Sequence, residues 1–241
     1  MRSYKRYTRR KRLLKHIVVV ALVFILGLVL LRAVSYIAIQ GEIPMINSFN
    51  LFRREADTSF GWNLILVNDD YRIPRNYKVE LTELSNGEKV DSRIYPQLQQ
   101  MFDDARTEGL ELFVREGYRT TQDQKNIMNE RIQKYQDEGY SRWEAKERAE
   151  EYVAEPGTSE HELGIAVDIN ADTSKCSADA VYTWLANNAY KYGFIKRYPD
   201  DKTEITGVNN EPWHYRYVGV DSAIEMQEKG LCLEEYIESL R

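Results

Sequence analysis

The chain has 241 residues, of which 43% are hydrophobic and 12% aromatic. This length and balance exclude a disordered polar tail, a coiled coil and a disulfide-stapled miniprotein, and they allow one core of ordinary domain size. Eight of the 33 basic residues lie in residues 1–16, which contain no acid, so the rest of the chain has 25 basic against 38 acidic residues and a net charge of −13. Such an acidic body repels phosphate backbones, which argues against nucleic-acid binding outside the basic tip.

Residues 17–39 are predicted to form a transmembrane helix. They consist of fifteen uncharged apolar residues, then Arg32, then a second apolar stretch. One helix of this length would measure roughly 34 Å at 1.5 Å per residue, enough to cross a bilayer core of about 30 Å. The long side chain of Arg32 can reach the headgroups from its place near the outer end. The positive flank predicts that residues 1–16 are a cytosolic tip and that the chain beyond about residue 40 is extracellular.

A cleaved signal peptide is the alternative interpretation of this segment. Ala33 and Ser35 are small residues at the two positions that a signal peptidase inspects. We favour a retained anchor in the cell membrane, because the charged region is long and the apolar run continues past that site. In either case Cys176 and Cys232 face a compartment that permits disulfides. The sequence leaves open whether they form one disulfide bridge or remain two free thiols.

Residues 40–61 lack sustained periodicity and are predicted as a stalk, and residues 62–241 as one folded domain. In chain order we expect a buried strand at 62–68, a hairpin with its turn at Asn86-Gly87, a helix from Pro96 to Gly109 and a strand at 110–114. Polar helices are predicted at 122–136 and 141–153, the second opening with a capping box of Ser141 and Glu144. A strand at 164–169, a helix at 178–192, a strand at 213–218 and a helix at 221–229 follow. Helices and strands mixed without βαβ regularity predict a single α+β domain with a small, mainly antiparallel sheet flanked by helices.

Two compact polar clusters in this domain contain histidine, one around His161 and one around His214. A catalytic zinc site needs three nitrogen or oxygen ligands, an open position for water and a nearby carboxylate that accepts a proton from that water. His161, Asp168 and His214 could supply the ligands and Glu211 the base. On the residues alone, hydrogen-bonded surface histidines remain the alternative. Serine catalysis has less support, because the chain has no Gly-x-Ser-x-Gly elbow.

The spacing Ser159-x-His161-x-x-Gly164-x-Ala166-x-Asp168, followed by Glu211-x-x-His214, resembles the paired signature of the zinc D-alanyl-D-alanine carboxypeptidases of the VanY type, relatives of the VanX dipeptidases. The block from Gly117 to Thr120 and the block from Glu211 to Gly219 resemble this family as well. The resemblance extends over roughly residues 62–240.

This resemblance implies one zinc ion bound by His161, Asp168 and His214, with Glu211 as the catalytic base. It further implies that Arg119 stabilises the transition state or binds the substrate. Ser159 and Gln124 are weaker candidates, which either donate hydrogen bonds to the substrate or brace their own loops. Glu116 departs from the pattern, because the family carries a serine before Gly117-Tyr118-Arg119, and this change bears on the rim of the substrate cleft. Glu160 and Glu162 flank a ligand, and we expect them to be solvated or to support the ligands.

The implied reaction is the removal of the terminal D-Ala from a peptidoglycan stem peptide outside the membrane. Closely similar signatures serve L,D-carboxypeptidases that act on tetrapeptide stems and D,D-dipeptidases, so both remain alternatives among enzymes. A non-catalytic cell-wall-binding module is the alternative from another class. Glu211 and Arg119 argue against it, because a structural zinc site closes its fourth position with another ligand and needs no base. The sequence carries no signal for the oligomeric state.

Overall fold

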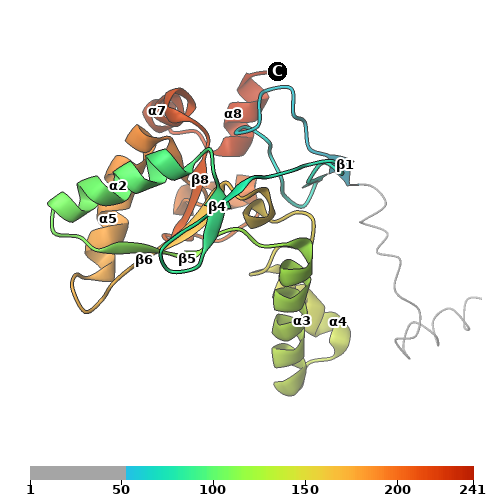
Figure 1. Cartoon of the computed structure of the whole chain (residues 1–241). Helices are drawn as coiled ribbons and strands as arrows, with labels where there is room; N and C mark the ends of the chain where they lie inside the picture. The colour runs from blue at the N-terminus through green and yellow to red at the C-terminus, as the bar shows by residue number, and fades with distance from the viewer. Residues whose placement is uncertain (1–52) are drawn as a thin grey trace, which may run out of the picture. The chain divides into compact units, whose positions relative to one another are not determined.

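A four-stranded sheet with the strand order β5-β6-β8-β7 organises residues 53–241, the part of the chain that this computed structural model describes (Figure 1). The strands are β5 (Leu112–Glu116), β6 (Ala166–Ala171), β7 (Phe194–Lys196) and β8 (His214–Tyr217). All three neighbouring pairs are antiparallel. The predicted α+β domain with a small, mainly antiparallel sheet is therefore confirmed for these residues.

Strand β6 has one apolar face and one polar face. Val167, Ile169 and Ala171 are buried in the main hydrophobic core, together with apolar residues of β5. Because successive side chains of a strand point to opposite faces, Asp168 projects from the other side of the sheet. Strand β6 therefore packs into the main core through one face and carries Asp168 on the other.

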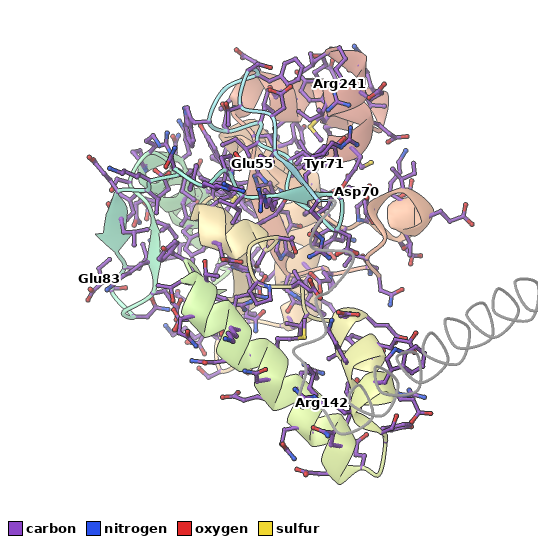
Figure 2. The ribbon with its side chains drawn as sticks, turned by 90° about the vertical axis from the view of Figure 1, so that its right-hand side faces the viewer. Glu55, Asp70, Tyr71, Glu83, Arg142 and Arg241 are labelled. Carbon is purple, nitrogen blue, oxygen red and sulfur yellow. The ribbon has the colours of Figure 1, made fainter. Side chains whose placement is uncertain are left out.

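Helices surround this sheet. The α-helices are α2 (Tyr95–Thr107), α3 (Thr121–Asp137), α4 (Arg142–Glu150), α5 (Ala178–Asn188), α6 (Thr203–Thr206), α7 (Val220–Lys229) and α8 (Leu233–Ser239), and the 3-10 helices are η1 (Glu160–Leu163), η2 (Ala189–Tyr192) and η3 (Asp200–Lys202). Helix α2 packs on β5 and α5 on β6, while α3 and α4 pack on each other as a hairpin that projects from the rest of the domain (Figure 1). Figure 2 shows Arg142, the first residue of α4, near the tip of this hairpin.

The predicted helices are confirmed where the sequence carries end signals. Helix α2 has Pro96 in its first turn and buries the apolar stripe Leu98, Met101 and Ala105. Helix α4 opens with the predicted capping box, in which Ser141 and Glu144 satisfy each other's backbone N–H groups. The helix predicted at 178–192 is instead α5 followed by the separate turn η2, and helices α6 and α8 were not predicted.

Two shorter strand pairs complete the domain. Strands β3 (Leu81–Glu83) and β4 (Lys89–Asp91) form the predicted antiparallel hairpin. Strand β1 (Arg54–Glu55) pairs in parallel with β2 (Tyr71–Arg72), and Figure 2 shows Glu55 and Tyr71 at this pair. The compact unit therefore begins at Arg53 and not at residue 62. The last residues of the predicted stalk belong to the domain, because they pair with β2 and bury Ala56 in the main core.

The predicted strand at 62–68 is wrong, although its burial was predicted correctly. Leu64 to Val67 are buried, yet the segment pairs with no strand in the described part of the chain. Two of its carbonyl groups accept from a side chain instead, since Nη2 of Arg216 donates to the carbonyl oxygens of Asn63 at 3.2 Å and Ile65 at 2.8 Å. A fully buried arginine thus takes the place of a neighbouring strand.

The two cysteines are free thiols, so the disulfide that the sequence left open is absent. Cys176 lies before α5, where its sulfur contacts the backbone of Glu111. Cys232 is buried at the N-terminus of α8. The fold gives each thiol its own packing partners.

The predicted cytosolic tip (1–16) and transmembrane helix (17–39) lie outside the described residues. Within residues 53–241, the structure contains no helix with the length and apolar character needed to cross a bilayer.

Replacing Gly117 with alanine should lower the free energy of unfolding by about 1–3 kcal/mol, the usual cost of forcing atoms into a packed site. A Cβ atom at this position would clash with the backbone carbonyl oxygen of Lys89 in β4. Urea denaturation followed by circular dichroism measures the change. Gly109→Ala is the matched control, because no atom lies within 4 Å of its Cβ and only the positive φ of +81° opposes the side chain. An equal loss in both variants would contradict the packing explanation.

Candidate active site

The register between β6 and β8 positions two of the predicted metal ligands. Asp168 and His214 are direct partners in this antiparallel pair, so their side chains project from the same face of the sheet. That face is opposite to the one that Val167 and Ile169 bury in the core. Nδ1 of His214 lies 3.1 Å from Oδ1 of Asp168.

The third predicted ligand, His161, reaches the same place from the 3-10 helix η1. Gly164 ends this helix in the left-handed conformation, with φ of +74°, and turns the chain into β6. Nδ1 of His161 donates to the carbonyl oxygen of Gly117 at 2.8 Å, and the backbone N–H of Arg119 donates to the carbonyl oxygen of His161. The first bond orients the ring and the second holds the backbone of His161, and Nε2 of the ring lies 3.5 Å from Oδ1 of Asp168.

The three side chains fit a zinc ion. Each offers one ligand atom, and these atoms lie within 4.8 Å of one another. Oδ1 of Asp168 is buried, and the described residues give it no hydrogen bond of good geometry. Two imidazole nitrogens and one carboxylate oxygen form the donor set of a catalytic zinc site, which keeps one position open. The sequence prediction that His161, Asp168 and His214 converge is therefore met by the geometry.

The electrostatics of this cluster favour a bound cation. Burial would raise the pKa of Asp168, but the adjacent His161 and His214 outweigh it and hold the pKa well below its usual range. Burial would lower the pKa of His214, but the carboxylates of Asp168 and Glu160 raise it to about 9. Several carboxylates thus converge on this point of the fold and stabilise positive charge there.

Glu211, the predicted base, lies beside these ligands on the segment between α6 and β8. Its backbone N–H donates to the carbonyl oxygen of Tyr198, and its Oε2 atom lies 3.6 Å from Nδ1 of His214. Burial raises the pKa of Glu211, and the nearby Asp168 adds to this against the opposing effect of His214. A carboxylate with a raised pKa is better matched to proton transfer near neutral pH.

A cleft of about 280 Å³ contains these groups together with the three other predicted site residues. Its lining includes Arg119, Gln124, Ser159, Glu160, His161, Asp168, Tyr198, Glu211, Trp213 and His214. Helices α3 and α4 and the residues that follow them form the outer wall, which includes Arg131 and Tyr152. The site is therefore an open cleft between the polar face of the sheet and the projecting hairpin.

The guanidinium group of Arg119 is held in place by two neighbours. Nε and Nη2 each lie 3.0 Å from Oε2 of Glu116, and Nη1 donates to Oε1 of Gln124 at 3.3 Å. Gln124 is buried, and its Nε2 donates to the carbonyl oxygen of Ala154. These bonds favour a bracing role for Gln124. Ser159 is buried and lines the cleft, and its side chain does not cap η1.

Sequence reasoning missed the two buried arginines near the predicted ligands, Arg197 and Arg216, and left open whether Glu160 is solvated or supports a ligand. Glu160 accepts hydrogen bonds from Arg197 at 2.9 Å and from Arg216 at 2.7 Å, and all three side chains are at most 1% exposed. The sequence does carry a signal for Arg216. It lies two residues after His214 in a predicted strand, and residues two apart share a face of a strand, so Arg216 is expected on the same face as His214. The sequence gives no comparable signal for the hydrogen bond to the carbonyl group of Gly117, because every residue type has a backbone carbonyl group.

Comparison with known proteins agrees with the family that the sequence resembles. The family model for VanY, D-alanyl-D-alanine carboxypeptidase, matches residues 87–220. A D-alanyl-D-alanine carboxypeptidase of Enterococcus faecalis is 53% identical over 196 residues, which cover 81% of this chain and 73% of that relative.

Two solved structures have the same fold. The complex of VanYB with D-alanine-D-alanine has a TM-score of 0.72 and 56% sequence identity, and the match covers 75% of this chain and 99% of that one. A variant of the vancomycin resistance D,D-pentapeptidase VanY in complex with Zn(II) has a TM-score of 0.70 and 57% identity, over 73% and 99% of the two chains. The resemblance drawn from the sequence is confirmed, and the chain belongs to the VanY family of D-alanyl-D-alanine carboxypeptidases, which are zinc metallopeptidases.

Proposed function

We propose that this D-alanyl-D-alanine carboxypeptidase releases the terminal D-Ala of peptidoglycan stem peptides on the outer side of the cell membrane. The observation that carries the proposal is the convergence of His161, Asp168 and His214 with Glu211 and Arg119 in one cleft. A relative of the same fold binds D-Ala-D-Ala, the dipeptide that ends such a stem. The basic tip and the apolar residues 17–39 support anchoring in the membrane with the catalytic domain outside.

The metal-binding role falls to His161, Asp168 and His214, whose nitrogen and oxygen atoms suit zinc. When bound, zinc supplies a Lewis acid that lowers the pKa of a water molecule and polarises the carbonyl group of the substrate. Nε2 of His161 and Nδ1 of His214 are the ring nitrogens that face Asp168. The chain itself thus provides three fixed ligand atoms and an open cleft in front of them.

Glu211 is placed to move the proton. Its Oε2 atom lies beside Nδ1 of His214, and the carboxylate lines the cleft where the scissile amide would enter. The carboxylate accepts the proton of the attacking water, and the protonated acid then donates it to the nitrogen of the leaving D-Ala. Burial is the main cause of the raised pKa of Glu211. The raised pKa makes the carboxylate a stronger base for the first transfer, and a pKa closer to neutral pH suits a group that must both accept and return a proton.

Arg119 provides a positive charge in the cleft that contains the predicted ligands. Its guanidinium group is oriented by Glu116 and Gln124, and its side chain is 18% exposed. This cation either stabilises the negative charge that develops on the carbonyl oxygen during attack or binds the terminal carboxylate of the substrate. A pre-oriented guanidinium group loses little side-chain entropy when it makes such contacts.

Synthetic stem peptides test the substrate. Zinc-loaded full-length protein should remove one D-Ala from a pentapeptide that ends in D-Ala-D-Ala, and a chelator should stop the release, as detected by mass spectrometry. Cleavage of the tetrapeptide alone would identify an L,D-carboxypeptidase, and release of free D-Ala from the dipeptide alone would identify a D,D-dipeptidase. Folded, zinc-loaded protein that cleaves none of these peptides would favour the wall-binding module.

Glu211→Gln should lower kcat for D-Ala release by about 10²- to 10⁴-fold, the usual contribution of a general base, and should leave zinc bound. The amide keeps the size of the side chain but cannot accept the proton. Steady-state kinetics together with the zinc content of the purified variant measure both effects. Glu204→Gln, at an exposed position of α6, is the control and should retain activity. A kcat within about threefold of the unmodified enzyme would refute the role of Glu211.

Asp168→Asn should abolish stoichiometric zinc binding, because the carboxamide replaces the charged oxygen that faces both histidines. Equilibrium dialysis followed by elemental analysis measures the bound zinc. Asp172→Asn, just beyond the end of β6, removes a partly exposed carboxylate that bonds to Ser174 and should leave zinc binding intact. One equivalent of zinc retained by the Asp168 variant would exclude this ligand.

A further inference from the structure

Glu160 is a buried carboxylate that lies directly behind one of the metal ligands. Its Oε1 atom accepts from Nε of Arg197 at 2.9 Å and from Nη1 of Arg216 at 2.7 Å. Its Oε2 atom faces Nε2 of His214 at 3.6 Å. Neither of these last two atoms has a hydrogen-bond partner elsewhere among residues 53–241. A carboxylate oxygen such as Oε2 of Glu160 can accept a hydrogen bond, and Nε2 of His214 can donate one when it carries a hydrogen.

The opposite side of the His214 ring faces the metal ligands. Nδ1 of His214 lies 3.1 Å from Oδ1 of Asp168 and 3.6 Å from Oε2 of Glu211. A neutral imidazole has one N–H donor and one nitrogen lone pair, and a carboxylate can only accept. A hydrogen on Nε2, directed at Glu160, therefore leaves the lone pair of Nδ1 free to bind a metal ion.

We propose that Glu160 is a positioning residue for zinc, which holds His214 in the tautomer that carries its hydrogen on Nε2 and presents Nδ1 to the metal. The proposal rests on the zinc site of the proposed function. A carboxylate that accepts a hydrogen bond from a metal-binding histidine fixes the orientation of the ring and makes it a stronger ligand. Glu160 thus acts through His214 and takes no part in the proton transfers.

The surroundings hold Glu160 in this position. Arg197 also donates to Glu234, and Arg216 also donates to the carbonyl oxygens of Asn63 and Ile65, so neither guanidinium group can turn away. Their two positive charges offset the charge of the buried carboxylate, which would otherwise be costly. Oε1 is occupied by the arginines, and Oε2 remains directed at His214.

A backbone carbonyl group, and not a carboxylate, orients the other histidine, His161. Nδ1 of His161 donates to the carbonyl oxygen of Gly117, which leaves Nε2 for the metal. The two histidines therefore bind through different ring nitrogens, one set by a backbone carbonyl group and the other by the carboxylate of Glu160. A metal site whose two rings are both held from behind needs little rearrangement when the ion binds.

Glu160→Gln in the full-length protein tests the proposal through zinc affinity, measured without substrate by competition with a chromophoric chelator. We expect zinc to bind about 10- to 100-fold more weakly, the usual effect of losing such a partner. Glu162→Gln is the matched control, because Glu162 lies on the same turn of η1 but accepts from the backbone N–H of Gly157 instead. The control should bind zinc as tightly as the unmodified chain, and an unchanged affinity in Glu160→Gln would overturn the proposal. Zinc binding without cleavage of any stem peptide would contradict the proposed function and not the role of Glu160.

Nuclear magnetic resonance of zinc-loaded, unmodified protein with ¹⁵N-labelled histidine gives a second test, which does not depend on whether the variant folds. The chain has three histidines, so the spectrum is simple. We expect the ring proton of His214 on Nε2 and that of His161 on Nδ1. A ring proton of His214 on Nδ1, with Nε2 bound to the metal, would overturn the proposal.

Discussion

The pairing of β6 with β8 is the constraint on which the rest of the site depends. In this register Asp168 lies directly opposite His214, and a shift by one residue would move one of the two to the core face. The apolar residues on the other face of β6 make such a shift costly, because Val167 and Ile169 are fully buried. The hydrophobic core therefore sets the position of two of the predicted metal ligands.

A second constraint is the group of buried charges next to His214, formed by Glu160, Arg197 and Arg216. Arg216 lies two residues after His214, and its guanidinium group bonds to Glu160 and to the backbone of the segment before β2. Burying charged groups is expensive unless each has partners of opposite charge and satisfied hydrogen bonds. The bonds of Arg216 hold the segment that contains Asn63 and Ile65, which has no strand partner, and they hold Glu160, which faces His214. The stability of the domain and the geometry of the site thus share these residues.

The sequence predicted those features that depend on local chemistry. Prolines, capping residues and glycines located most helices within a few residues, and the spacing of the paired motifs identified the residues that line the cleft. Predictions that depended on distant partners were less successful. The predicted strand at 62–68 is wrong, because two carbonyl groups of this segment accept from the side chain of Arg216, far along the chain, and not from a neighbouring strand. The compact unit starts at Arg53, because β1 pairs with β2. The membrane anchor stays a prediction, since residues 1–52 are outside the description.

By itself the sequence determined the α+β class, the VanY family and the residue types needed for zinc peptidase chemistry. It did so because ligand identity, motif spacing and hydrophobic periodicity are local properties of the chain. Only the tertiary structure decided which ring nitrogens of His161 and His214 face Asp168, that Arg119 is held by Glu116, and that the thiols of Cys176 and Cys232 remain unpaired. These features depend on contacts between segments that are far apart in the chain, and no local pattern encodes the distance between two such segments.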